Sequence, residues 1–154
     1  MGIYKLQTEQ LLNTGLEEVW DFISSPKNLQ RITPKGMGFK ITSGELPAKM
    51  YPGMMISYKV KPLGGIPITW VTEITQVKEH EYFVDEQRMG PYSIWHHEHH
   101  LISTENGVLM KDTVTYKPPL GFIGDLMVIL FIRKKLSSIF DYRRSVLNEL
   151  FNSK

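Results

Sequence analysis

Hydrophobic and polar residues alternate along most of the chain from residue 39 to residue 117. A period of two residues is typical of strands that turn one face to a core. The pattern predicts strands near 39–44, 54–61, 67–78, 82–89, 92–103 and 107–117, and a less regular alternation from Ile3 to Leu12 predicts one more. Short turns separate consecutive strands, and one of them holds Asn106-Gly107, a pair typical of hairpins. The predicted sheet is therefore antiparallel.

A helical spacing of hydrophobic residues occurs on both sides of these strands. Thr14 and Glu17 have the spacing of a capping box, which predicts a short helix ending near Ile23. Pro26 predicts the start of a second short helix. The segment from Gly121 to Phe151 carries one apolar stripe and predicts a helix of about 45 Å, which must lie across the sheet. The sequence thus predicts an α+β fold with a cavity between a curved sheet and the long helix.

Length and composition indicate one globular domain over residues 1–154. The chain is 42% hydrophobic and 22% charged, which argues against disorder. Its formal net charge of +2 is too small to favour a nucleic-acid partner. The absence of cysteine excludes disulfides, thiolate metal sites and thiol nucleophiles. The N-terminus lacks the pattern of a signal segment, so the expected location is the cytoplasm.

Four of the five histidines lie in one predicted strand, 92–103. Alternate side chains of a strand point to opposite faces. His97 and His99 share a face with an apolar residue at each end, and this face is predicted to look inward. The opposite face is polar throughout and is predicted to meet solvent: His96, Glu98 and His100. Two imidazoles on an inner face are either hydrogen-bonded within a core or part of a site.

Asp112 is predicted to point inward from the strand that follows, together with Tyr116. A four-residue loop would place His99 opposite Asp112, and a two-residue loop would place Leu101 there; either register keeps the two histidines within reach. A buried carboxylate is costly without a partner. We therefore expect Asp112 to pair with His97 or His99 and to raise the basicity of that histidine. The pair would act as a general base, as a polar anchor for a ligand, or only as a link within the core.

His97, His99 and Asp112 also imitate the two-histidine, one-carboxylate set of a metal site. A His-x-His pair on a strand is common by chance, and we expect no metal ion. The chain has no phosphate-binding loop, no G-x-G-x-x-G fingerprint and no G-x-S-x-G motif. No cofactor is therefore expected.

Further residues are candidates for the cavity wall. Phe83, Asp85 and Gln87 share one face of their strand, and we expect this face to be the inner one. Arg143 falls on the apolar stripe of the long helix. A cation there indicates a salt bridge, to Asp85 or Asp112, or an anchor for an acidic ligand. Four aromatic residues that each carry a polar group complete the predicted wall: Trp70, Tyr92, Trp95 and Tyr116.

Residues 121–132 are apolar nearly all round and are followed by Arg133, Lys134 and Lys135. A helix of this kind is either buried or meets another apolar surface. A buried helix start is the interpretation we favour. A lid over the cavity, a peripheral membrane contact and a dimer interface are the alternatives, and the oligomeric state stays open.

Three groups of residues resemble a known superfamily. The groups are FVDEQ..GPY..W.H.H from Phe83 to His99, D.V.Y..P.G from Asp112 to Gly121, and F.R..L..IFDYR from Phe131 to Arg143. In this order they resemble a bacterial branch of the START-like, helix-grip superfamily, often labelled SRPBCC or polyketide cyclase/dehydrase-like. The resemblance covers nearly the whole chain. One departure is Leu101, where many relatives have phenylalanine.

The resemblance implies a helix-grip fold, in which a curved antiparallel sheet of about seven strands wraps a long C-terminal helix. It also implies a hydrophobic or aromatic small-molecule ligand between sheet and helix. We therefore expect a ligand-binding module. One alternative is an enzyme of the cyclase or dehydratase kind that uses His97, His99 and Asp112 for proton transfer. A second alternative is a membrane-associated protein that handles a lipid or a quinone.

Overall fold

The computed structural model describes residues 2–62 and 65–153. They contain a seven-stranded sheet in the order β1-β7-β6-β5-β4-β3-β2, in which all neighbouring strands are antiparallel. The strands are β1 (Tyr4–Leu12), β2 (Lys40–Ile41), β3 (Met54–Val60), β4 (Ile68–Lys78), β5 (Tyr82–Met89), β6 (Ile94–Thr104) and β7 (Gly107–Lys117). The predicted α+β fold with an antiparallel sheet of about seven strands is confirmed.

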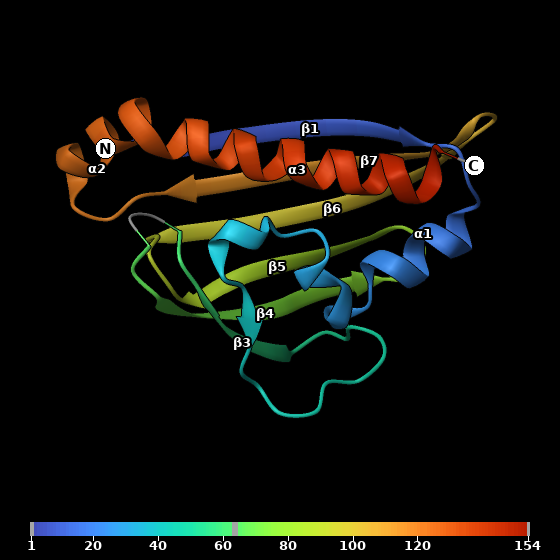
Figure 1. Ribbon diagram of the computed structural model, residues 1–154, viewed down its shortest axis with the longest axis horizontal. Helices are drawn as coiled ribbons and strands as arrows, with labels where there is room; N and C mark the ends of the chain where they lie inside the picture. Colours follow the sequence, from blue (N-terminus) through green and yellow to red (C-terminus); the bar gives the residue numbers. More distant parts are fainter. Residues whose placement is uncertain (1, 63–64, 154) are drawn as a thin grey trace.

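The helices cover one face of this sheet (Figure 1). Strand β1 is followed by α1 (Leu16–Ile23) and by two short 3₁₀-helices, η1 (Pro26–Gln30) and η2 (Lys35–Met37). Residues 118–120 connect β7 to α2 (Gly121–Met127), which continues without a break into a π-helical turn, η3 (Val128–Ile132), and into α3 (Arg133–Phe151). Figure 1 shows α3 running along β1 and β7, with α2 at the end beside the N-terminus. Within the described residues, no helix is both long enough and apolar enough to span a membrane.

The predicted capping box at the start of α1 is wrong. The N-cap residue is Gly15, and no side chain caps the helix. The Thr14 hydroxyl instead forms a hydrogen bond with the carboxylate of Glu18. Glu17 and Glu18 lie in the first turn, where the helix dipole favours negative charge. The acidic first turn that suggested a capping box therefore stabilises the helix in a different way.

The hairpin between β6 and β7 adopts the register in which His99 lies opposite Asp112. This is the register expected for a four-residue loop, but Thr104 also pairs with Gly107, so the turn consists of residues 105–106 and not of Asn106-Gly107. Gly107 has a φ of 127°, and a Cβ atom there would lie 2.1 Å from the carbonyl oxygen of Leu12. Only glycine fits such a position. This register turns the inner histidines of β6 and the carboxylate of β7 to the same, helix-covered face.

Buried side chains on that face form three clusters. The largest joins α1 and the C-terminal end of α3 to the sheet and includes Trp20 and Leu147. The second packs η3 and the first part of α3 against β7 and includes Val114 and Leu136. The third joins η2 to β3 and β4 and includes Trp70. Residues of all three clusters line one open space on this face of the sheet.

Candidate functional site

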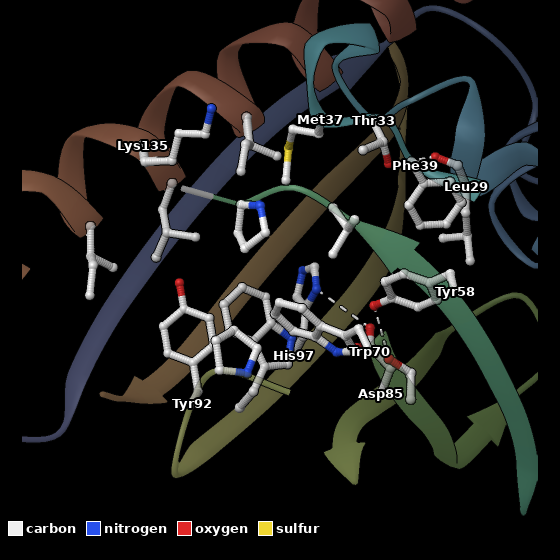
Figure 2. Close-up of a pocket in the computed structure, with 18 of the residues that line it drawn as sticks. Leu29, Thr33, Met37, Phe39, Tyr58, Trp70, Asp85, Tyr92, His97 and Lys135 are labelled. Carbon is white, nitrogen blue, oxygen red and sulfur yellow. Dashed lines mark hydrogen bonds and ion pairs between the residues drawn. The ribbon is translucent and has the colours of Figure 1, made fainter. Parts of the chain in front are cut away.

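A cavity of about 340 Å³ lies where the three clusters meet. Its wall comes from the inner face of the sheet, from α3, from the η1–η2 segment and from the chain around α2. Figure 2 shows Met37 and Lys135 on one side of the cavity and Trp70, Tyr92 and His97 on the other. The volume is within the range of about 300–1,000 Å³ that small-molecule sites occupy.

Sequence reasoning missed the part of the wall that comes from η1, η2 and β3. This part includes Leu29, Met37 and Tyr58. The hydroxyl of Tyr58 lies 3.1 Å from that of Thr72 on β4, which holds the tyrosine ring in place. The available signal was the apolar residues spaced along 29–37, but two short helices without a long periodic pattern do not reveal what they cover.

Trp70 is the centre of an aromatic group in the cavity wall. Its ring centroid lies 5.2 Å from that of Trp95, 5.8 Å from that of Tyr92 and 6.1 Å from that of Tyr58. Burial raises the pKa of the Tyr92 hydroxyl, so this group stays protonated. The rings form a broad apolar surface suited to a flat or aliphatic ligand. Three predicted aromatic wall residues, Trp70, Tyr92 and Trp95, therefore do line the cavity.

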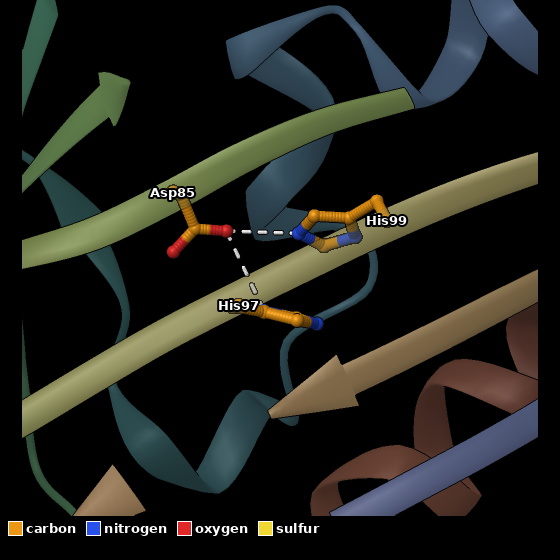
Figure 3. Close-up of side chains that lie close together, drawn as sticks. All are labelled: Asp85, His97 and His99. Atoms are coloured by element: carbon orange, nitrogen blue, oxygen red, sulfur yellow. Dashed lines mark hydrogen bonds and ion pairs between the residues drawn. The ribbon is translucent and has the colours of Figure 1, made fainter. Parts of the chain in front are cut away.

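A polar cluster interrupts the apolar part of this wall. It consists of Asp85 on β5, His97 and His99 on β6 and, behind them, Asp112 on β7, and it is referred to below as the His–Asp cluster. Nε2 of His99 lies 2.8 Å from Oδ2 of Asp85, and its Nδ1 lies 2.8 Å from Oδ1 of Asp112. His97 bridges the same carboxylates, with Nδ1 3.4 Å from Asp85 and Nε2 3.2 Å from Asp112. The imidazole centroids are 3.7 Å apart. Figure 3 shows the Asp85 carboxylate directed at both rings.

The His–Asp cluster has a cavity side and a far side. Asp85, His97 and His99 line the cavity, whereas Asp112 lies behind them and is not part of the wall. Arg143 of α3 also lines the cavity and places Nη1 3.6 Å from Oδ1 of Asp112. Of the two predicted partners of Arg143, the structure brings Asp112 into contact. The expected contact of Asp112 with the histidines is present, while the second carboxylate, Asp85, was not predicted to join it.

Two side chains of the wall carry N–H groups without an acceptor. Within the described residues, Nε and Nη1 of Arg143 and Nε1 of Trp70 are buried and form no hydrogen bond, and the ion pair of Nη1 with Asp112 at 3.6 Å is too long for one. The guanidinium also lies 4.9 Å from the ring centroid of Phe140, an apolar neighbour. Buried donors normally find a partner. A carbonyl or carboxylate oxygen is the kind of acceptor that could satisfy these donors.

The His–Asp cluster separates the protonation states of its two histidines. Burial lowers the pKa of His97 to about 4, so this imidazole is neutral near pH 7. Burial acts on His99 in the same direction, but hydrogen bonds to Asp112 and Asp85 outweigh it and raise its pKa. Burial alone would raise the pKa of both carboxyl groups, but the neighbouring imidazoles outweigh it and lower these pKa values. With Arg143, two anions then face two cations, and the cluster is electrically balanced.

The neutral His97 places a base at the cavity wall. A carboxylate only accepts hydrogen bonds, so the proton of His97 is on Nε2, which lies within hydrogen-bond distance of Asp112. Its Nδ1 carries the lone pair and lies on the side of Asp85. His99 donates to both carboxylates as an imidazolium. A proton acceptor and a proton donor thus lie side by side, as in sites for acid–base chemistry.

The cavity side of the cluster also has the donor set of a metal site. Asp85, His97 and His99 each offer one ligand atom, and these atoms all lie within 4.8 Å of one another. Two histidines and a carboxylate suit zinc or iron. The set contains Asp85, whereas the sequence suggested Asp112, which lies behind both imidazoles. A metal ion would have to displace the proton on Nε2 of His99, because only the unprotonated nitrogen coordinates.

Two other predicted wall residues lie away from the cavity. Tyr116 is buried against β1, with its ring centroid 5.8 Å from that of Tyr4. The amide of Gln87 donates to the backbone carbonyl of Tyr92 at 2.6 Å and so holds the turn before β6. Both side chains have structural contacts in place of the ligand contacts expected for them. The outer histidines of β6 pair with carboxylates on the opposite face of the sheet: His96 with Glu86, and His100 with Glu98.

No protein-family model and no curated protein sequence matches this chain. Solved structures do match. Protein CV1439 from Chromobacterium violaceum has a TM-score of 0.73 at 12% identity, covering 97% of this chain and 99% of that one. A START superfamily protein from Mycobacterium smegmatis has a TM-score of 0.71 at 10% identity, covering 98% of both chains. The di-domain ARO/CYC protein BexL from the BE-7585A biosynthetic pathway has a TM-score of 0.73 at 13% identity, covering 99% of this chain and 51% of that one.

The chain therefore has the START-like, helix-grip fold. At identities of 10% to 13% the likeness shows the fold alone. The chain spans about half the length of BexL, which has two domains. The chain thus combines the START-like fold with a mainly apolar cavity, and three members of the His–Asp cluster lie in the wall of that cavity.

Proposed function

We propose that this protein binds a hydrophobic small molecule in the cavity between the sheet and α3. The observation that carries the proposal is the cavity itself, about 340 Å³ of space with an aromatic and aliphatic wall and one charged cluster. A concave, mainly apolar space of this size with a few polar groups is typical of sites that bury a small apolar molecule. Fold and function are separate questions, so the proposal rests on the site and not on the neighbours.

The polar groups in the cavity wall favour a ligand that binds in one fixed orientation. Arg143 and Trp70, whose N–H groups lack hydrogen-bond acceptors, line the mainly apolar cavity together with His97 and Asp85. A few polar groups in an apolar pocket typically fix the orientation of a ligand. The ligand is therefore an apolar molecule, aromatic or aliphatic, with an oxygen acceptor at one end.

Replacing Ile139 by tryptophan is expected to weaken the binding of Nile red, a neutral apolar dye, by roughly tenfold or more. Ile139 lines the cavity from α3, and an indole at this position would fill space that the dye needs. A fluorescence titration measures the affinity.

The matched control is Ser138→Trp, which adds the same indole to an exposed position of the same helix. This variant should bind Nile red as the wild type does. Equal affinity of the Ile139→Trp protein and the wild type would place the dye outside the cavity and reject the proposal.

A second candidate function is proton transfer on the bound molecule, of the kind that cyclases and dehydratases perform. The neutral His97 beside a protonated His99 favours it. A carbon-bound proton next to a ligand carbonyl would move to Nδ1 of His97, and the electron pair of the broken C–H bond would form an enolate. The guanidinium of Arg143 would stabilise the enolate oxygen, and this oxygen would then take the proton back from Nδ1 of His97, which gives the enol and restores the neutral imidazole. The similarity of fold to an ARO/CYC protein is consistent with this function but does not support it independently.

His97→Ala is expected to slow the keto–enol conversion of benzoylacetone by about 100-fold relative to the wild type, the usual contribution of a general base. The affinity for benzoylacetone should change little, since the rest of the wall is intact. The conversion is followed by ultraviolet absorbance. His96→Ala, on the outer face of the same strand, is the control. If the wild type does not accelerate the conversion, or if His97→Ala is as fast, the protein is a binder without this activity.

A further inference from the structure

The least expected surface of the molecule is an exposed apolar face on α2 and η3. Its members are large hydrophobic side chains, each between 49% and 81% exposed: Leu120, Phe122, Ile123, Leu126, Ile129, Leu130 and Phe131. They are referred to below as the α2–η3 face. The favoured expectation of a buried helix start is therefore wrong for most of this segment. Exposed apolar patches of this kind mark contact with another apolar phase or partner.

The α2–η3 face belongs to a fixed helix and not to a loosely attached segment. Val128 and Ile132 of the opposite side pack into the core. Gly124 fits against the Pro118–Pro119 segment so closely that a Cβ atom would lie 2.0 Å from the Pro119 carbonyl oxygen. Asp125 accepts hydrogen bonds from the Gly2 amide and the Tyr4 hydroxyl, which tie the helix to β1. The exposed side chains are thus held outward by a rigid support.

The same helix forms part of the cavity wall. Leu120, Gly124, Met127 and Ile132 line the cavity. Leu120 is also a member of the exposed face, so the apolar surface outside and the apolar wall inside meet at this residue. A hydrophobic ligand could pass between a covering apolar phase and the cavity here without crossing water.

The basic residues that follow the α2–η3 face favour a membrane over a second copy of the chain as the partner of this face. The α2–η3 face is followed by three consecutive basic residues, Arg133, Lys134 and Lys135, and no acidic residue occurs from 126 to 140. Two copies joined through this face would bring their basic residues together, which is unfavourable. A bilayer with anionic lipids offers an apolar phase and a complementary negative surface, the combination that interfacial helices use.

We infer that the α2–η3 face inserts into the surface of an anionic lipid bilayer and admits the ligand from it. This inference rests on the proposed ligand binding and specifies its substrate class: a lipid-soluble molecule that resides in the membrane, with an oxygen acceptor at one end. The docked protein would lie with α2 in the interface and with the basic residues at the lipid head groups.

The inference is tested by co-sedimentation with vesicles of phosphatidylcholine and phosphatidylglycerol. The double variant Phe122→Ser, Ile129→Ser removes two side chains that are 81% and 70% exposed. Since burying each contributes substantially to transfer, the partition onto vesicles should fall by roughly tenfold or more. The matched control is Met55→Ser, Ile102→Ser, which removes two exposed apolar side chains from strands, 46% and 45% exposed, and should bind vesicles as the wild type does. Vesicles of phosphatidylcholine alone, or added salt, should weaken binding of the wild type.

Three outcomes would overturn the inference. The first is no binding of the wild type to anionic vesicles, and the second is equal binding by the Phe122→Ser, Ile129→Ser protein. The third is a dimer in light scattering that this variant dissociates while vesicles do not bind. A failure of the proposed ligand binding would give a different result. In that case Ile139→Trp would leave the affinity for Nile red unchanged, regardless of how the protein binds vesicles. If the proposed ligand binding and the membrane contact are both correct, Ile139→Trp will bind Nile red weakly and vesicles normally. The Phe122→Ser, Ile129→Ser protein will bind Nile red normally and vesicles weakly.

Discussion

Replacing Asp112 by alanine is expected to lower the free energy of unfolding by about 3–5 kcal/mol, the range measured when one partner of a buried ion pair is removed. Oδ1 of Asp112 contacts His97 at 3.2 Å, His99 at 2.8 Å and Arg143 at 3.6 Å. Without it, the imidazolium of His99 would keep Asp85 as a carboxylate partner, and the buried guanidinium of Arg143 would lose its contact with Asp112. The measurement is urea unfolding followed by tryptophan fluorescence.

The control for this prediction lies on the other face of β6. Glu98 also contacts two histidines, with carboxylate oxygens 3.2 Å from His100 and 3.7 Å from His96, but all three side chains are partly exposed to water. Glu98→Ala should therefore cost less than about 1 kcal/mol. Similar losses in the two variants would mean that burial does not strengthen the inner cluster. Asp112→Asn keeps the shape and removes the charge, so the pKa of His99 should fall in an NMR titration.

The inner face of the site was predictable because strand geometry imposes it. In β6 and β7 the period of two assigned His97, His99 and Asp112 to one side, and the cost of a buried carboxylate then required a partner. The choice between the two hairpin registers was not available from the sequence. Asn106-Gly107 is compatible with more than one loop length, and the close approach of Gly107 to Leu12 is a contact between distant segments.

The role of Asp85 could be predicted only in part. The phase of β5 was ambiguous, because Phe83 and Val84 are both buried on opposite faces of the strand. The pairing of β5 with β4 also shifts register between Ile74 and Gln76, which alters how the two strands face each other. That Asp85 lies opposite His97 follows from the pairing of β5 with β6, and a single sequence does not show such a pairing at residue level.

For the segment 121–132, composition alone could not predict whether the helix is buried or exposed. A helix that is apolar all round is equally compatible with burial and with an apolar partner. What decided the matter is the close packing of Gly124 on the Pro118–Pro119 segment, which fixes the side of α2 that turns inward. The opposite side of α2 is then exposed to solvent. The apolar character of this segment, which suggested a buried helix, therefore suggests a membrane contact instead.

Stability is expected to depend on pH through the His–Asp cluster, with a maximum near the ordinary histidine pKa of 6.5. His97 has a folded pKa of about 4, so its contribution is complete above 6.5 and is lost as the pH falls toward 4. At about 1.4 kcal/mol per pKa unit, the loss is on the order of 3 kcal/mol. His99 has the opposite sign. Its folded pKa is raised, so its contribution is complete below 6.5 and is lost as the pH rises through the folded value.

The carboxylates add a second step at low pH. The folded pKa values of Asp85 and Asp112 lie below the ordinary value of 3.8, so their contribution is present above 3.8 and is lost as the pH falls through the folded values. Urea unfolding of the wild type at a series of pH values should thus show one decline between 6.5 and 4 and a steeper one below. His97→Gln cannot be protonated in this range, so it should remove the first decline and keep the second. A wild-type profile that is flat from 6.5 to 4 would mean that His97 is protonated in the folded protein, and it would no longer qualify as the base at the cavity wall.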